Sequence, residues 1–195
     1  CERIEKEQNL RNAMYLQMLQ MQINPHFLYN TLETLKCLVI MNDDKAEEMV
    51  GAIGDFYKGA LISGDDVIRM KEEIQHVESY LKIMKLRYRK KMDYTINVEK
   101  DLMNNVALKL SLQPIVENAI IHGFIKKNNG NEIAVKSTLC NDIMQISIKN
   151  TGAAIEPSKL IEIQKRLKDE DTILQEHIGL FNTNMRYKLL FGQPY

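Results

Sequence analysis

Apolar residues in the first third of the chain recur at the spacing of an amphipathic helix. The intervals between them alternate between four and three residues when Pro25 fills one position, and the repeat continues for more than three heptads. Such a seam fits either an intramolecular helix bundle or a dimeric coiled coil. We favour the dimer, because a single helical hairpin would leave apolar surface uncovered. The seam comprises Met14, Met18, Met21, Pro25, Leu28, Leu32, Leu35 and Val39.

Two more helices are predicted before residue 90. The polar run MNDD ends the first helix, and Asp43 or Asp44 is placed to cap a second helix that continues to about Ile62. A turn is expected at 63–66, where the sequence reads SGDD. A third helix, over about 71–89, has apolar residues on one side and charged residues on the other.

The hydrophobic pattern changes after residue 90 from helical spacing to a mixture of alternating strands and short helices. Alternation with period two predicts strands, whereas the other segments keep helical spacing. We therefore divide the chain into a helical region, residues 1–90, and a mixed region, residues 91–195, with an α+β fold overall. The mixed region is expected to hold strands at 93–99, 130–140 and 142–150, with a turn at 141–142, and mainly helical segments at 107–125, 157–169 and 179–191.

The composition narrows the possible functions. Of the 195 residues, 45% are apolar, enough for a sizeable core, and the 26 Lys and Arg residues balance the 26 Asp and Glu residues. Balanced charge gives no general attraction for nucleic acid, so no nucleic-acid partner is expected. The odd number and wide spacing of Cys1, Cys37 and Cys140 argue against a disulfide framework or a zinc site. The longest apolar runs are too short to span a bilayer, and the charged start is unlike a signal peptide.

The stretch QINPHFLYN places a proline and a histidine within the first predicted helix. His26 lies beside the apolar seam, and Asn30 follows one helical turn later on the same face. A lone histidine at such a position is more often a packing residue than a reactive one. Pro25, however, removes a helical hydrogen bond and bends the axis next to His26, which would expose the imidazole. A neutral imidazole is a competent nucleophile near neutral pH.

Three polar residues interrupt an otherwise apolar helix within LQPIVENAIIHGF. Glu117 and Asn118 are adjacent, and His122 follows Asn118 by one turn. Burying them without partners would be costly, so this polar face suggests a ligand such as a metal ion with phosphate oxygens. A set of polar residues satisfied within the core is the competing interpretation.

Two glycine-containing segments add weaker signals. IKNTG ends a predicted strand with a polar residue and a flexible backbone, and HIGLFNTNMRY puts Gly179 just before a helix whose N–H groups could face phosphate. Arg186, two turns into that helix, could add positive charge. An ordinary turn and an ordinary glycine before a helix are the competing interpretations.

In this order, the four motifs resemble those of sensor histidine kinases of the LytS/YehU/YesM type. QINPHFLYNTLETL is similar to their phosphoacceptor segment, LQPIVENAIIHG to the N box, and IKNTG and IGLFNTNMRYKLLFG to the two glycine boxes. EEIQHVESYLKIMKLRY is similar to their connecting helix, so the resemblance covers about residues 16–192. It implies a dimerising helical hairpin or bundle followed by a GHKL (Bergerat) α/β sandwich that binds ATP. Such a sandwich has further strands after the second glycine box, so the domain is expected to be truncated at its C-terminus.

The resemblance implies roles for individual residues. His26 would accept a phosphoryl group in a homodimer formed by the N-terminal helices and pass it to an aspartate of a response regulator. Asn30 would orient the imidazole, and Glu33 would be the base, since Phe27 occupies the place where an acid often follows the histidine. ATP and Mg²⁺ are the implied cofactors, with Asn118 holding Mg²⁺ against the phosphates. The residues implied to line the nucleotide site are Glu117, Asn118, His122, Asn150, Gly152, Gly179, Leu180, Asn182 and Arg186.

Three positions depart from the family pattern. Asn150 stands where an aspartate usually reads the adenine amino group, Ala154 where a second glycine is common, and Ile121 where many kinases carry a phosphate-contacting lysine. An amide carbonyl accepts the amino proton without charge assistance, so weak or regulated ATP binding is expected. The resemblance also implies the cytoplasmic portion of a bacterial membrane protein, with membrane contact only through segments outside this sequence.

Two other functions stay open as alternatives. A degenerate kinase fold could serve as a dimeric scaffold with weak or no ATP turnover. The glycine-box departures favour that function, and the intact His26, Asn30 and Asn118 disfavour it. An ATPase or chaperone on the same nucleotide fold could use Glu117 as a water-activating base, but it would leave the proline–histidine pair unexplained.

Overall fold

The computed structural model describes residues 25–61, 66–124, 130–141, 143–168 and 178–192. The chain divides into two compact units, residues 1–62 and 63–195. The predicted seam positions Met14, Met18 and Met21, and the chain before Pro25 that a bend would require, lie outside the described residues. None of the helices in the described part is both long and apolar enough to cross a membrane.

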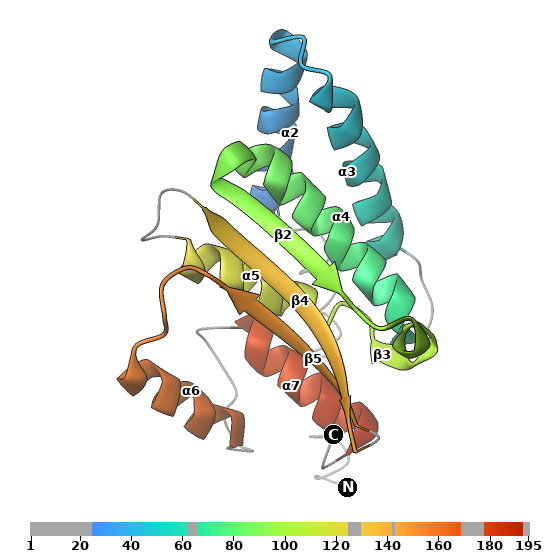
Figure 1. The fold of residues 1–195 in the computed structure, drawn as a ribbon, viewed down its shortest axis with the longest axis vertical. Coiled ribbons are helices and arrows are strands. Elements are labelled where there is room, and N and C mark those ends of the chain that lie inside the picture. Colours follow the sequence, from blue (N-terminus) through green and yellow to red (C-terminus); the bar gives the residue numbers. More distant parts are fainter. Residues whose placement is uncertain (1–24, 62–65, 125–129, 142, 169–177, 193–195) are drawn as a thin grey trace, which may run out of the picture. The chain divides into compact units, whose positions relative to one another are not determined.

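The first unit contains a helical hairpin of α2 (Pro25–Ile40) and α3 (Lys45–Leu61) (Figure 1). The rings of Phe27 and Phe56 join the two helices, with their centroids 5.1 Å apart. Burying two aromatic rings against each other supplies much of the apolar contact available to so small a unit. The buried residues of the hairpin are Phe27, Thr31, Leu38, Met49, Ala52 and Phe56.

The predicted seam of α2 is not the face that the hairpin buries. Thr31 and Leu38 are buried, whereas Leu32 and Val39, one position later in each case, are 47% and 62% exposed. A rotation of one residue is about 100° around a helix, so the two sets of positions lie on different faces. Among the seam positions that the structure describes, Leu32 and Val39 are therefore uncovered, and Leu28 and Leu35 are half-buried.

The turn between the two helices explains why the run MNDD separates them. Asn42 has a φ of 50°, and its N–H donates to the carbonyl of Val39 while the N–H of Asp43 donates to that of Leu38, both at 3.0 Å. This is the Schellman arrangement that ends a helix with one left-handed residue. The carboxylate of Asp43 then accepts a hydrogen bond from the N–H of Lys45 at 3.1 Å, at the start of α3.

The second unit is built on a three-stranded sheet in the order β2–β4–β5. β2 runs parallel to β4, and β4 and β5 form an antiparallel hairpin whose turn includes Asn141 at a φ of 50°. All three predicted strands are confirmed. Their bounds are Met92–Asn97 for β2, Asn131–Cys140 for β4 and Ile143–Asn150 for β5.

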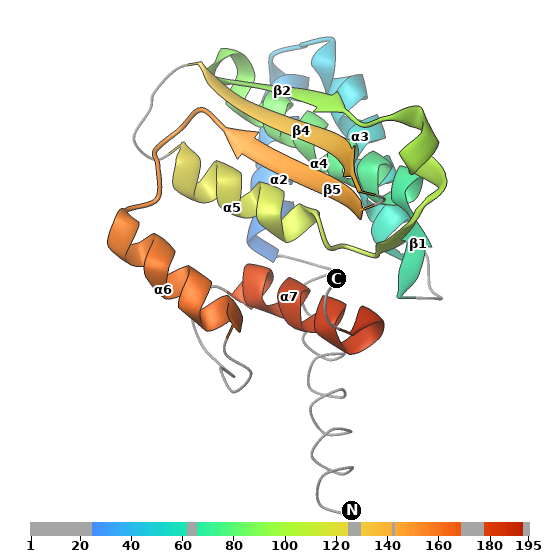
Figure 2. The same cartoon turned by 60° about the horizontal axis from the view of Figure 1, so that its bottom comes forward.

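Two helices, α4 (Met70–Tyr88) and α5 (Gln113–Gly123), cover one face of this sheet (Figures 1 and 2). Burial along β4 alternates, so that Ile133 and Val135 are fully buried while their neighbour Lys136 is exposed. The alternation follows from the period of two in a strand, and it turns one side of β4 toward the helices. The helices meet this side with apolar residues that include Val77, Leu81, Val116 and Ile120.

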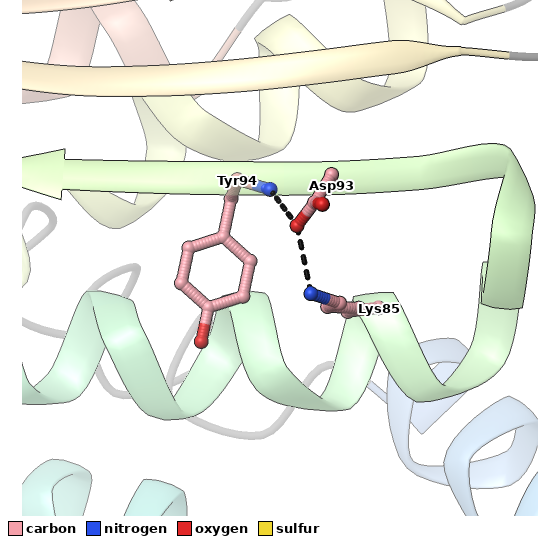
Figure 3. A network of polar contacts seen from close by, with 3 residues as sticks. All are labelled: Lys85, Asp93 and Tyr94. Atoms are coloured by element: carbon pink, nitrogen blue, oxygen red, sulfur yellow. Dashed lines mark hydrogen bonds and ion pairs between the residues drawn. The ribbon is translucent and has the colours of Figure 1, made fainter.

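The helix α4 belongs to the second unit, ahead of the division that the hydrophobic pattern placed at residues 90 and 91. Lys85 Nζ of α4 lies 2.7 Å from the Asp93 carboxylate of β2, which also accepts the N–H of Tyr94 (Figure 3). Hydrophobic periodicity indicates where the type of secondary structure changes, whereas a compact unit is defined by which elements pack together. Because α4 packs on the sheet, it belongs to the same unit as the sheet.

Two short strands pair apart from the main sheet. β1 (Val67–Arg69) is antiparallel to β3 (Val106–Leu108). The segment 107–125, predicted to be mainly helical, thus begins in a strand, and α5 starts only after Leu110, whose φ of 56° breaks any helix there. The remaining elements are η1 (Arg89–Lys91), η2 (Lys100–Asn104), α6 (Pro157–Lys168) and α7 (Ile178–Phe191), and the last two match the predicted helices. The mixture of helices and sheet confirms the α+β class.

Candidate functional site

His26 and Asn30 contact each other on α2, where His26 is exposed. The amide nitrogen Nδ2 of Asn30 lies 3.0 Å from Nε2 of His26. With the amide nitrogen as the donor, Nε2 is the acceptor, and the tautomer that fits this contact carries its proton on Nδ1. The next residue, Phe27, is buried against Phe56, and this packing keeps the histidine on the outside of the hairpin. Glu33 is also exposed on α2, two turns beyond His26.

The segment that leads into α5 is held by a side chain from another helix. Glu73 of α4 is completely buried, and its carboxylate accepts backbone hydrogen bonds from Leu110 at 2.8 Å, Ser111 at 2.7 Å and Leu112 at 2.8 Å. These three N–H groups belong to the segment that leads into α5 and to its N-cap residue Leu112, so Glu73 holds the approach to the helix. Burial raises the pKa of Glu73, and the three backbone donors lower it in part.

The next turn of α5 carries the polar face that the sequence indicated. Glu117 and Asn118 are half-buried, and Glu117 Oε1 accepts a hydrogen bond from Nε2 of Gln113 at 2.7 Å. Oε1 of the same Gln113 lies 2.6 Å from Nε2 of His76 on α4. Burial raises the pKa of Glu117, and the bond from Gln113 lowers it in part. His122 is exposed in the last turn, where a positive charge suits the helix dipole.

The C-terminal end of α5 lies against the segment that follows β5. A Cβ on Gly152 would overlap the backbone carbonyl of Gly123, and a Cβ on Gly123 would overlap the side-chain amide of Asn150. The N–H of Ala153 donates to the carbonyl of Gly123 at 2.9 Å. The predicted residues Asn150 and Gly152 are therefore in contact with the end of the helix that carries Glu117.

The other end of α5 lies against α7. A Cβ on Gly179 would come within 2.9 Å of Cβ of Pro114, so this glycine has a packing reason as well as any role toward phosphate. The hydroxyl of Thr183 donates to the carbonyl of Gly179 at 2.9 Å, within the first turn of α7. Leu180 and Asn182 are half-buried on the same helix.

Arg186, further along α7, lies in a charged cluster inside the second unit. Burial lowers the pKa of Arg186, whereas the nearby carboxylates of Asp66 and Glu73 raise it. Its Nη2 atom is buried and has no hydrogen-bond partner among the described residues. Burial also lowers the pKa of Lys109, which the same two carboxylates raise. Arg186 thus has counter-charges within the protein, in addition to the phosphate contact predicted for it.

The helix α5 is where the predicted nucleotide-site residues of the second unit converge. It carries Glu117, Asn118 and His122, and its two ends contact Gly152 and Gly179. Within the described ranges, no group of three or more His, Cys, Asp or Glu side chains could hold a metal ion. The donors present fit an ion such as Mg²⁺, which takes one or two protein oxygens and completes its shell with phosphate oxygens and water. His26, Asn30 and Glu33 belong to the first unit, which is a separate body.

Four residues of this arrangement had no role in the sequence analysis. Gln113 and Gly123 lie within the motif LQPIVENAIIHG, and Glu73 and His76 lie within EEIQHVESYL. The sequence offered one signal for Glu73, which is a carboxylate next to the apolar side of a predicted helix. Its meaning depends on backbone donors 37 to 39 residues away, which no local pattern reveals.

Comparison with known proteins gives a consistent result. Residues 14–92 match the family described as Histidine kinase. The chain is 27% identical over 98% of its length to sensor histidine kinase YpdA of Escherichia coli (strain K12) and 29% identical over 100% to sensor histidine kinase YesM of Bacillus subtilis (strain 168). It is 30% identical over 97% of its length to sensor protein LytS of Streptococcus mutans. The alignments cover 33%, 32% and 32% of these relatives, so the chain spans about a third of their length.

Proposed function

We propose that this chain, a homologue of sensor histidine kinases whose residues 14–92 belong to the histidine kinase family, transfers a phosphoryl group from ATP to His26. The observation that carries the proposal is the exposed imidazole whose Nε2 lies 3.0 Å from the amide of Asn30. That geometry favours the tautomer with a lone pair on Nε2, which is the nucleophilic form. The exposed position would let a phosphoryl donor approach the ring.

In the proposed reaction, Asn30 releases Nε2 of His26, and the freed lone pair attacks the γ-phosphorus of ATP. The bond from phosphorus to the bridging oxygen breaks, and its electrons leave with ADP. The ring then carries a positive charge until Nδ1 releases its proton. We propose Glu33, two turns along α2, as the acceptor of that proton by way of water, because the residue next to the histidine is Phe27. Unchanged autophosphorylation in Glu33→Gln would assign the proton to another group.

The nucleotide site is proposed to be organised around α5 in a domain of the GHKL type. Asn118 would hold Mg²⁺, with Glu117 and His122 lining the same site, and the ion would neutralise charge on the phosphates. The polar face of a half-buried helix supports this role, since the side chains there need partners. Asn150 and Gly152, at the end of α5, and Gly179, Leu180, Asn182 and Arg186 of α7 are proposed to complete it.

Incubation of the full chain with γ-labelled ATP and Mg²⁺ tests the proposal. Wild type should acquire an acid-labile, base-stable label. His26→Gln should lose the label while nucleotide binding persists, because His26 lies in the first unit and the proposed nucleotide-site residues lie in the second. Asn118→Ala should lose both label and Mg²⁺-dependent binding. A label that survives in His26→Gln would contradict the assignment of the acceptor.

A second candidate function is a dimeric scaffold with weak or no ATP turnover. It is favoured by Asn150, whose side-chain amide lies against Gly123 and which lacks the charge of an aspartate for contacting an adenine amino group. Isothermal titration of the full chain with Mg²⁺–ATP is expected to show weak binding. Absence of label under all conditions would favour the scaffold, and tight binding would contradict the expectation of weak affinity.

The proposed partners follow from the same relationship. A second copy of the chain is proposed to cover the seam of α2, where Leu32 and Val39 are exposed. A response regulator aspartate is proposed to receive the phosphoryl group from His26. The location expected from the family, on the cytoplasmic side of a membrane protein, stays a prediction.

A further inference from the structure

A chain of hydrogen bonds runs from α4 to the polar face of α5. Nε2 of His76 lies 2.6 Å from Oε1 of Gln113, and Nε2 of Gln113 donates to Oε1 of Glu117 at 2.7 Å. Both bonds are short for their type. The sequence separation between His76 and Gln113 is 37 residues, so the link exists only in the folded unit.

The direction of these bonds can be assigned from chemistry. An ionised carboxylate only accepts hydrogen bonds, so the amide nitrogen of Gln113 must face Glu117 and its carbonyl must face the histidine. Nε2 of His76 must then carry a proton and donate it. The three side chains therefore have one consistent arrangement, in which the buried His76 fixes the amide plane of Gln113.

The amide of Gln113 controls how Glu117 is oriented. Within the part of the chain that the structure describes, the side-chain group that donates to Glu117 Oε1 is Nε2 of Gln113. Holding one carboxylate oxygen fixes the rotation of the group and thereby the direction of the other oxygen. A carboxylate that loses this donor is freer to rotate, so the orientation of Glu117 depends on Gln113.

The helix α4 contacts this region at further points. Glu73, one turn before His76, holds the three backbone N–H groups that lead into α5. Burial raises the pKa of Tyr80, one turn after His76, and the charge of Glu117 raises it further. The same face of α4 thus holds both the start of α5 and the carboxylate in its second turn.

We propose that His76 and Gln113 are positioning residues, which hold the Glu117 carboxylate in the orientation that phosphoryl transfer requires beside Asn118. This inference rests on the proposed kinase function and adds two residues to its machinery. It assigns to α4 the role of setting the geometry of the nucleotide site. Neither residue needs to touch the nucleotide for this role.

The first test does not depend on activity. Long-range ¹H–¹⁵N spectra of the full chain labelled at histidine are expected to show His76 with its proton on Nε2. Gln113→Met, which keeps the side-chain volume but cannot accept at that point, should shift the signals of the His76 ring. A neutral His76 ring with its proton on Nδ1 would overturn the inference.

The second test measures the rate of His26 labelling against the affinity for Mg²⁺–ATP. Gln113→Met and His76→Leu are each expected to lower the labelling kcat about tenfold and to change the nucleotide Kd less than twofold, since misplacing a reacting group affects the transition state most. His76→Gln should recover most of the rate, because the glutamine amide nitrogen can reach the position of Nε2. Gln75→Met, the same substitution at the neighbouring exposed position, should match wild type.

A double-mutant cycle separates positioning from general loss of structure. If Gln113 acts through Glu117, adding Gln113→Met to Glu117→Gln should lower the remaining rate less than twofold. A full additional tenfold loss, or a Gln113→Met rate equal to that of wild type, would overturn the inference while leaving the kinase proposal intact. A wild-type chain that takes up no label and binds no nucleotide would instead overturn the proposed function, and this inference with it.

Discussion

At the scale of single residues, Gly152 shows how closely two segments of the second unit approach. Its Cα position leaves no room for a side chain, because a Cβ would overlap the carbonyl of Gly123. The obstacle is backbone at the end of a helix, which cannot rotate away as a side chain could. The N–H of Ala153 also donates to this carbonyl at 2.9 Å, so a displaced loop would lose that bond as well.

We predict that Gly152→Ala destabilises the protein by about 1–3 kcal/mol through overpacking and weakens nucleotide binding in parallel. Chemical denaturation with Mg²⁺–ATP titration measures both effects. Gly54→Ala is the matched control, because nothing lies near that position in α3 and alanine should stabilise the helix by roughly 1 kcal/mol. A Gly152→Ala protein as stable as wild type would show that the segment after β5 moves freely.

At the scale of secondary-structure elements, Glu73 joins α4 to the start of α5. Its three backbone donors explain why a buried carboxyl is tolerated, and its burial raises its pKa in the folded state. A raised folded pKa means that the folded state binds the proton more tightly than the unfolded state. The stability contributed by this titration is therefore complete below the ordinary glutamate pKa and is lost as the pH rises through the folded value.

We predict that the unfolding free energy of wild type, measured relative to Glu73→Gln, falls as the pH rises from about 4.5 toward the raised folded value. At neutral pH, Glu73→Gln should still cost about 1–3 kcal/mol, because an amide cannot accept three backbone N–H groups. Denaturation curves across this pH range measure both quantities. Glu78→Gln, at an exposed ion pair with Lys82, should change stability by less than about 1 kcal/mol.

If the unfolding free energies of wild type and Glu73→Gln changed equally with pH, Glu73 would have the same pKa in the folded and the unfolded protein. That outcome would contradict the direction of its shift. A destabilisation similar to that of Glu78→Gln would contradict its role in holding the segment that leads into α5.

The elements also show what periodicity could and could not predict. The strands β2, β4 and β5 alternate over six or more residues and were predicted from the sequence. β1 and β3 are only three residues long, too short for any period, and they exist because they pair with each other across 67–69 and 106–108. The local sequence of α5 predicted a helix, yet the segment that leads into it is held by Glu73, which is distant in the chain.

The candidate site divides in the same way. His26 and Asn30 are one turn apart, so helical spacing alone predicted that they share a face, and the 3.0 Å contact agrees with that expectation. Gln113 and His76 are joined across 37 residues, and only the packing of α4 on α5 brings them together. Sequence motifs marked the side chains of α5, whereas the residues that orient them came from the fold.

At the scale of the whole molecule, the uncovered seam of α2 is the feature that calls for a second chain. Leu32 and Val39 are exposed although they continue an apolar heptad, and the hairpin already uses a different face for its own contacts. An apolar stripe of this kind is stabilised when a second helix covers it. The proposed homodimer would cover it with the same stripe of the partner.

We predict that Leu32→Asp shifts the proposed dimer to monomer, raising the dimer dissociation constant on the order of tenfold or more, because a charge would be placed in an apolar seam. Sedimentation velocity over a range of protein concentrations measures the change. The second unit should be unaffected, so the nucleotide Kd of the variant should equal that of wild type. Ile143→Asp is the matched control, since Ile143 is 67% exposed at the end of the β4–β5 hairpin.

The two variants together decide whether the seam or general surface hydrophobicity drives association. If Leu32→Asp and Ile143→Asp lower the association equally, exposed apolar area of any kind would be responsible. If wild type is monomeric at high concentration, the seam does not dimerise in this chain, and the exposed Leu32 needs another explanation. A loss confined to Leu32→Asp would assign dimerisation to the heptad of α2, in which Pro25 is a seam position and His26 lies beside the predicted interface.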